Sequence, residues 1–194
     1  NRGISAVEGV GGATFEDYQF DGLSRMTKAI NDFSTVERKY DFLNRLIEEK
    51  QNGKLINYTY SVVNNLRKMA MQYPNQRIVE KDFDILDRIS RIRQGQESIA
   101  DFSYIGRSYR MLSQQFGNGN TISYLYDQGR RLTSKETKNK NSDLINKYVY
   151  GYNKVGMKMF EQRGHNGNKG DAFNYDEVCR LTGVKFNSPE PVTG

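Results

Sequence analysis

A recurring signature runs through this sequence of 194 residues: an aromatic residue, an acid or its substitute, a turn, a basic residue and an apolar one. The aromatic residue before the acid stands at positions 20, 40, 60, 83, 104, 126, 152 and 175, so the intervals are 20, 20, 23, 21, 22, 26 and 23 residues. A period of this size is typical of a stacked-repeat architecture. The repeats therefore favour a stretch of an array over one ordinary domain.

The eight copies keep the signature to different degrees. Five carry aspartate at the acid position, the third and fifth keep the frame with weaker residues, and the seventh is a variant with asparagine. We expect no catalytic, cofactor-binding or metal-binding residue, and we assign structural roles to the signature side chains. These are Phe20, Asp21, Arg25, Tyr40, Asp41, Arg45, Tyr58, Tyr60, Phe83, Asp84, Arg88, Tyr104, Arg110, Tyr124, Tyr126, Asp127, Arg131, Tyr152, Gly156, Tyr175, Asp176 and Arg180.

Two stretches look helical in isolation. Residues 34–37 read as a capping box followed by apolar residues at helical spacing, and residues 82–93 offer a second helical path. Copies at one phase of a repeat should share a conformation, however, and residues 55–60 and 121–126 are rich in aromatic and β-branched residues with partial alternation. The signature therefore predicts strands.

Two kinds of turn alternate along the chain. One lies inside each signature, where the aspartate can bond the backbone two residues on, and the other lies between signatures at Asn-Gly and similar pairs such as Asn52-Gly53. Strands of roughly six to eight residues fit between them. We predict an all-β fold of antiparallel β-hairpin repeats in a spiral or extended sheet, with a lead-in at 1–14, the array at 15–185 and a tail at 186–194.

The side chains of the signature have structural and functional interpretations. Alternating aromatics such as Tyr58 with Tyr60 can stack along neighbouring strands, although an aromatic stripe can also bind sugars or bases. The acid and the arginine, as in Asp21 with Arg25, lie on opposite limbs of one turn and can hydrogen-bond across it. Paired acids for acid–base catalysis are not indicated, because the acids are spread one per repeat.

Charge and composition limit the possible partners. The net charge of +6 and a pI near 9.3 could suit an acidic partner, but many arginines stand at one phase of the repeat, which indicates a structural position. A nucleic-acid partner is therefore not expected. No apolar run is long enough to span a membrane, and no signal peptide is visible. Because the chain begins at Asn1 without methionine, we expect it to be processed, trimmed or excerpted.

A few isolated features could suggest chemistry. Cys179 has no second cysteine to pair with and stands where other copies carry Ser24 or Asn44, while His165 lies in a glycine-rich loop. Residues 164–171 lack the context of a phosphate-binding loop and the ligand order of an EF-hand. The lysine-rich residues 135–141 indicate an exposed hairpin turn. We predict no cofactor and no metal.

The segment Tyr-Leu-Tyr-Asp-Gln-Gly-Arg-Arg-Leu at 124–132 resembles the YD repeat of the Rhs family, and residues 58–65 and 150–158 resemble its Gly-Asn subtype with substitutions. The resemblance covers about residues 15–185. It implies long β-hairpins wound into a spiral sheet that closes as a hollow shell. In bacterial Rhs proteins and insecticidal toxin complexes such a shell encloses a toxic C-terminal segment, and teneurins carry a similar shell in adhesion receptors.

The chain departs from the family pattern in three ways. It has too few repeats to close a shell alone, it lacks the Asp-Pro-containing region of self-cleavage, and nothing after Thr182 resembles a toxin domain. Self-cleavage and toxicity are therefore not expected of it.

The function expected from the resemblance is that of a non-enzymatic structural segment of a bacterial Rhs-type protein, secreted or at the cell surface, that encloses or scaffolds a toxin or effector. Its expected partners are other repeats of the same larger polypeptide or copies of itself through sheet edges, and an enclosed toxin segment. An alternative is a cell-surface adhesion module that recognises glycans or a protein partner. An enzyme would need a pocket that gathers dissimilar residues from several repeats.

Overall fold

The computed structural model describes residues 15–189 and residue 191. The predicted lead-in at 1–14 lies outside these described residues, as do residues 190 and 192–194 of the predicted tail. The regular elements of the described part are sixteen β-strands, without an α-helix, and the strands are antiparallel. The expectation of an all-β array of antiparallel hairpins is confirmed. The chain divides into two units, Asn1–Gln96 and Glu97–Gly194.

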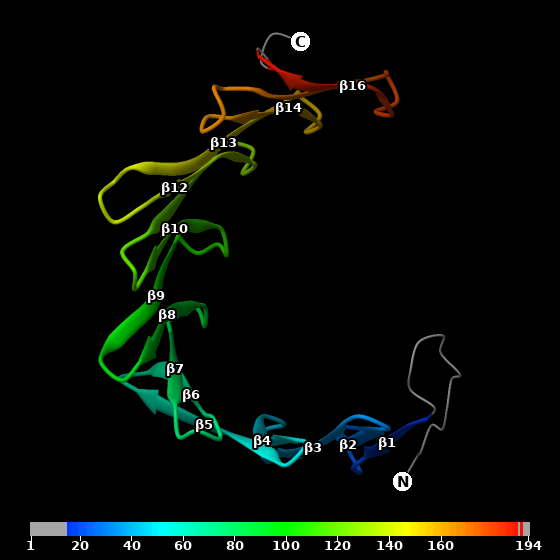
Figure 1. Ribbon diagram of the computed structural model, residues 1–194, viewed down its shortest axis with the longest axis vertical. Coiled ribbons are helices and arrows are strands. Elements are labelled where there is room, and N and C mark those ends of the chain that lie inside the picture. Colours follow the sequence, from blue (N-terminus) through cyan, green and yellow to red (C-terminus); the bar gives the residue numbers. More distant parts are fainter. Residues whose placement is uncertain (1–14, 190, 192–194) are drawn as a thin grey trace. The chain divides into compact units, whose positions relative to one another are not determined.

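The first unit contains eight strands that pair in chain order, so each strand forms a hairpin with the next (Figure 1). Among the described residues the first strand pairs only with the second, which leaves the sheet of this unit open. The strands are β1 (Glu16–Phe20), β2 (Met26–Asn31), β3 (Thr35–Tyr40), β4 (Leu46–Gln51), β5 (Lys54–Val63), β6 (Leu66–Gln72), β7 (Ile78–Phe83) and β8 (Ile89–Gln94).

The second unit repeats this arrangement with eight further strands in chain order. They are β9 (Glu97–Tyr104), β10 (Met111–Phe116), β11 (Thr121–Tyr126), β12 (Leu132–Lys138), β13 (Leu144–Tyr152), β14 (Lys158–Arg163), β15 (Gly170–Tyr175) and β16 (Leu181–Ser188).

The two stretches with helical spacing are strands and turns. Residues 34–37 include the start of β3, and the apolar residues at helical spacing lie in β3, in the next turn and in β4. Residues 82–93 span the end of β7, a turn and β8. Each of these two turns contains a residue with positive φ, 61° at Asn44 and 63° at Asp87. That conformation interrupts a helix, and pairing with neighbouring strands satisfies the backbone instead.

A β-bulge marks most of the signature aromatics. In β1 and β2, Gln19 pairs with Lys28 but Phe20 pairs with Met26, so Thr27 is an extra residue on the second strand. The same shift occurs where β3, β7, β11, β13 and β15 end. Because a bulge increases the local twist, each hairpin turns as it approaches its signature turn.

The third hairpin, between β5 and β6, has no such shift. Its register is regular to the pair Val63 and Leu66, and Asn64 and Asn65 form the two-residue turn with φ of 52° and 62°. Two central residues with positive φ define the type I′ turn that matches the twist of paired strands. This copy therefore extends its strands where the others turn.

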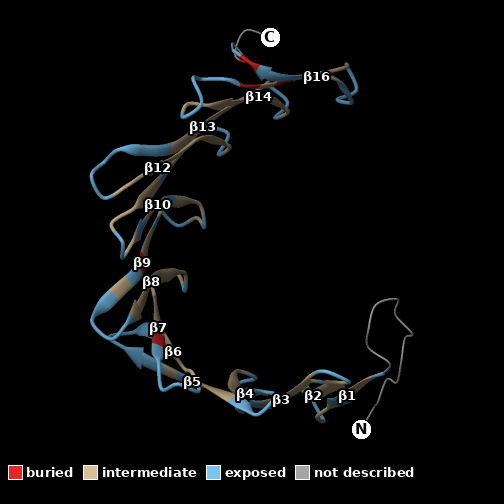
Figure 2. Cartoon of the chain, viewed as in Figure 1, coloured by how far each residue is buried: buried red, intermediate tan, exposed pale blue. Residues whose placement is uncertain are grey.

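The described residues of each unit form a single layer. Figure 2 shows that most of them are half-buried or exposed, and the buried apolar side chains among them are those of Val79, Ala100, Ala172 and Pro191. A layer this thin cannot bury the apolar core that stabilises most domains. The conformation therefore depends strongly on strand pairing and on the side-chain contacts between hairpins.

Candidate functional site

The signature turn is organised by its aspartate. In the first copy, Asp21 Oδ1 accepts hydrogen bonds from the backbone N–H groups of Leu23 and Arg25, at 2.9 and 3.0 Å, and Oδ2 accepts one from Arg25 Nε at 2.6 Å. The Asp21 N–H in turn donates to the Arg25 carbonyl at 2.9 Å. One carboxylate therefore bonds both limbs of the turn.

The four other aspartate copies repeat this geometry. The arginine Nε lies 2.7 Å from the carboxylate in each of them, and the arginine N–H also donates to Oδ1. In the seventh copy Asn153 Oδ1 accepts from the N–H groups of Val155 and Met157, so the turn forms without an ion pair. The turn needs an oxygen acceptor at this position, and a charged pair is an addition.

The residue before the signature arginine has a left-handed backbone conformation. Its φ lies between 60° and 66° at Ser24, Asn44, Asp87, Arg130 and Cys179. The corresponding residue of the seventh copy is Gly156, with φ of 92°, where a side chain would be strained. The position of Cys179 is thus accounted for by backbone conformation.

Arg25, Arg45 and Arg131 also contact the next hairpin of their own unit. The guanidinium of Arg25 lies 4.9 Å from the ring centroid of Tyr40, and Arg25 Nη1 donates to the Asp41 carbonyl at 3.2 Å. The Tyr40 hydroxyl donates back to the Met26 carbonyl at 3.0 Å. We call this set of contacts the Asp–Arg–aromatic ladder.

The ladder recurs in both units. Arg45 lies 4.5 Å from the Tyr60 ring, whose hydroxyl donates to the Leu46 carbonyl. Arg131 lies 4.9 Å from the Tyr152 ring, whose hydroxyl donates to the Leu132 carbonyl. In the last copy the Tyr175 hydroxyl donates to the Lys158 carbonyl at 3.0 Å.

The expectation of ring-on-ring stacking needs correction for these aromatics. Tyr40 and Tyr60 stand two strands apart, about 9.6 Å, whereas stacked rings lie 4.5–7 Å apart. The guanidinium of Arg45, near the start of the intervening strand, lies over the Tyr60 ring instead. The ring pair seen among the described residues is Tyr148 with His165, at 5.1 Å and edge to face.

The weaker copies use substitutes that sequence reasoning missed. In the third copy Arg67 lies 4.2 Å from the Phe83 ring and forms a 2.7 Å ion pair with Asp87. In the seventh, Lys158 lies 4.7 Å from the Phe173 ring. A basic residue one or two places beyond the expected position was the available signal. In the fifth copy Arg110 keeps its role over the Tyr126 ring, at 5.3 Å.

Half-buried tyrosines on the sheet include the signature aromatic Tyr60 and three that stand two residues before a signature aromatic, Tyr58, Tyr124 and Tyr150. Burial raises the pKa of Tyr58, Tyr60, Tyr124 and Tyr150. A raised pKa keeps each phenol neutral at physiological pH, so these tyrosines act as packing and hydrogen-bonding groups. Tyr124, for example, donates to Gln114 Oε1 at 3.3 Å.

The signature carboxylates are held ionised. The side-chain hydrogen bond from Arg25 holds the pKa of Asp21 below its ordinary value. For Asp127 and Asp176 the backbone N–H of the following arginine lowers the pKa most, and its side chain adds to this. A general acid needs a pKa near the working pH, so these groups suit hydrogen-bond acceptance in the turn.

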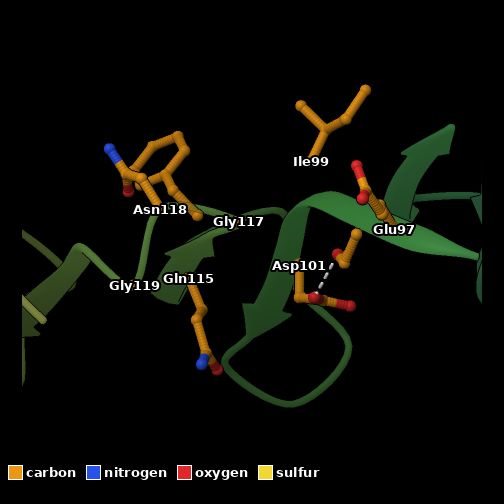
Figure 3. A pocket seen from close by; sticks show the side chains of 9 residues that line it. Glu97, Ile99, Asp101, Gln115, Gly117, Asn118 and Gly119 are labelled. Carbon is orange, nitrogen blue, oxygen red and sulfur yellow. Dashed lines mark hydrogen bonds between the residues drawn. The ribbon is translucent and has the colours of Figure 1, made fainter.

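One hollow lies on the second unit, with a volume of about 860 Å³. Its lining includes Asp101, whose Oδ2 accepts a 2.5 Å hydrogen bond from Ser98. Figure 3 shows Asp101 and Gln115 pointing the same way, whereas Asn118 lies away from them. The polar groups do not converge on one point.

Residues 15–189 and 191 contain neither a cluster of metal ligands nor a membrane-spanning helix. No group of three or more acidic, histidine or cysteine side chains there is placed to hold a metal ion. In the part of the chain that the structure describes, no helix is long and apolar enough to cross a membrane.

No protein-family model and no curated protein matches this sequence. Solved structures do match: TcdB2-TccC3 with a TM-score of 0.51, TcdB2-TccC3 without its hypervariable C-terminal region with 0.51, and TcdB2-TccC3-TEV with 0.50. Each match has 10% sequence identity and covers 89% of this chain. The chain has the fold of a segment of these Tc toxin chains.

This likeness of fold agrees with the YD-repeat resemblance of the sequence. The chain spans 13% of the length of the chains it matches. The shared feature is the array of consecutive antiparallel hairpins, which at 10% identity is retained while most side chains differ.

Proposed function

We propose that this chain is a non-enzymatic wall segment of an Rhs-type protein, which encloses or scaffolds another polypeptide segment. The observation that carries the proposal is the Asp–Arg–aromatic ladder. The arginine of one hairpin bonds its own turn and contacts the aromatic residue of the next hairpin, as Arg25 does with Asp21 and Tyr40. An array bonded in this way can be extended repeat by repeat without a unique site.

The single-layer sheet supports this role. One of its faces in the first unit carries half-buried aromatic, methionine and paired charged side chains, including Tyr58, Met71 and the ion pair of Arg38 with Glu49. Such a surface is neither a dry core nor a freely hydrated exterior. It suits the inside of an enclosure, where another chain lies close without a fixed contact.

The proposed partners follow from this role. They are further repeats of the same larger polypeptide and a toxin or effector segment enclosed by it. The proposed setting is a bacterial protein that is secreted or displayed at the cell surface. The fold likeness to Tc toxin chains supports this setting.

Limited proteolysis of the complete natural protein that carries this sequence tests the proposal. We expect segments outside the array to resist protease in the wild-type protein and to be cleaved rapidly in the variant Arg25→Ala/Arg45→Ala/Arg131→Ala. The reason is that loss of three ladder arginines loosens consecutive hairpins. Cleavage sites are read by mass spectrometry.

The single variant Arg180→Ala is the matched control, because Arg180 makes the same turn contact but is largely exposed. Equal cleavage of every segment outside the array in wild-type and triple-variant protein would contradict an enclosing wall.

A further inference from the structure

The two rims of the first unit differ in character. Because hairpin turns alternate between the ends of the strands, the turns after β1, β3, β5 and β7 lie on one rim, which we call the signature rim. It presents large exposed apolar side chains at every turn: Leu23, Phe42, Leu43, Val62, Val63, Leu66 and Ile85.

The opposite rim of the same unit is mainly polar. Its turns consist of residues 32–34, 52–53, 73–77 and 95–96, and Phe33 is the large apolar residue exposed within them. Ile78, at the start of β7, is partly exposed beside this rim. The difference therefore lies in which turns carry the apolar residues.

The apolar residues of the signature rim are not required by the turns. Phe42 and Ile85 directly follow the turn aspartates, and their side chains are 89% and 86% exposed. Most residue types fit the position after the turn aspartate, and a polar residue there would expose no apolar surface to water. A row of exposed apolar side chains on consecutive turns marks an interaction surface.

From the spacing and charge of this rim we infer that it is the contact surface for a second copy of the chain, rim against rim. Consecutive turns on the rim are two strands apart, roughly 9.6 Å. A second copy presents the same spacing and the same twist, so its side chains can enter the gaps between turns along the whole row. A partner without this period could meet only one or two turns.

The charges of the signature rim allow two copies of the rim to contact each other. The chain has a net charge of +6, which opposes self-association. At the rim, however, Arg25, Arg45 and Arg88 are each paired with their turn aspartate, and Arg67 is paired with Asp87. Two rims can therefore approach each other, because an aspartate neutralises each of these arginines locally.

The apolar area of the signature rim is sufficient for a dimer of moderate affinity. Seven apolar side chains of this size offer roughly 400–800 Å² for burial, against about 800 Å² on each partner of a standard interface. This contact is independent of the proposed wall function, since it concerns copies of the isolated chain.

Sedimentation equilibrium of the 194-residue chain tests the inference. We expect a concentration-dependent dimer, and we expect Phe42→Ser/Ile85→Ser to raise its dissociation constant by at least about tenfold. The matched control is Phe33→Ser, which removes the same type of exposed side chain, 71% exposed, from the opposite rim. It should change the dissociation constant by less than about twofold. Circular dichroism checks that the variants keep their strands.

A second variant does not depend on removing apolar groups. Leu43→Lys places like charges against each other across the contact, so its dimer should weaken at low salt and recover at high salt. The inference is overturned if the wild-type chain stays monomeric at millimolar concentration, or if Phe33→Ser weakens the dimer as much as the double rim variant. Either result leaves the proteolysis test of the wall unaffected.

Discussion

The signature arginine combines three kinds of contact that a lysine could not make together. Arg25 donates in a fork to the Asp21 carboxylate, donates to the Asp41 carbonyl and to Asn44 Oδ1, and lies over the Tyr40 ring. A planar guanidinium fits all three directions, whereas an ammonium is a point charge on a flexible stem. At the residue scale the ladder therefore depends on arginine chemistry.

Arg25 and Arg180 form a natural comparison, because their contacts to the turn aspartate are alike but their side chains are 23% and 79% exposed. We expect Arg25→Ala to lower the free energy of unfolding by about 1–3 kcal/mol, since it removes the turn bond and the contacts to the next hairpin. Arg180→Ala should cost less than about 0.5 kcal/mol, because exposed ion pairs contribute little.

Urea unfolding followed by circular dichroism measures both changes, and Arg25→Lys should recover less than half of the loss. Equal costs for the two alanine variants would mean that the inter-hairpin contacts of Arg25 contribute nothing.

At the scale of the element, close backbone approach decides where a side chain is tolerated. A Cβ at Gly170, in β15, would overlap the carbonyl oxygen of Glu161 in β14, which is a backbone atom and cannot rotate away. Gly183, in β16, meets only the Asn174 amide nitrogen at 3.8 Å. Both glycines lie in paired strands, yet only the first is required by the sheet.

Gly170→Ala should lower the free energy of unfolding by about 2–3 kcal/mol, because β14 and β15 must separate to admit the methyl group. Gly183→Ala should be neutral or stabilising by up to about 1 kcal/mol, since alanine fits and the unfolded chain loses freedom. Thermal and urea unfolding of the two variants are the measurements. A Gly170→Ala protein as stable as the wild type would show that the approach of the two strands is looser than described.

At the scale of the whole molecule, stability is distributed over similar hairpins in place of a single core. In such structures each repeat is stabilised by its immediate neighbours, so the free-energy contributions of the repeats add along the array. The turn aspartates of both units are ionised and accept the same kinds of hydrogen bond. They are therefore protonated over the same pH range. Acid should therefore weaken many turns over one pH range.

The pH dependence has a defined sign. The pKa values of Asp21, Asp127 and Asp176 are lowered in the folded chain, so the unfolded chain binds protons first as the pH falls. Their stabilisation is present above the ordinary pKa of about 3.9 and is lost as the pH drops from there through the folded values. The urea midpoint should be level from pH 7 to 5 and fall between pH 4 and 2.

The variant Asp21→Asn/Asp127→Asn/Asp176→Asn is the control for the pH experiment. It should lose part of the acid-dependent decrease, because asparagine keeps the acceptor oxygen, as Asn153 does in the seventh copy, but does not titrate. A wild-type midpoint that is constant between pH 7 and 3 would contradict the role given to the ionised turns.

Local chemistry alone determined the period, the alternation of strands and turns, and the bond between Asp21 and Arg25. These features depend on residues within a few positions of one another, so their pattern is visible in the chain. The helical spacing that follows the capping box at 34–37, and the helical spacing of residues 82–93, mislead only in isolation, because the other copies exclude a helix.

Tertiary structure decided what lies next to what. The cation over each signature ring, the use of Arg67 and Lys158 in weak copies, and the close approach at Gly170 depend on the register between strands. The gathering of Phe42 and Ile85 on one rim also requires the order of the hairpins. Register and order are cooperative properties of paired strands, and a shift of one residue changes every neighbour, so a local pattern cannot specify them.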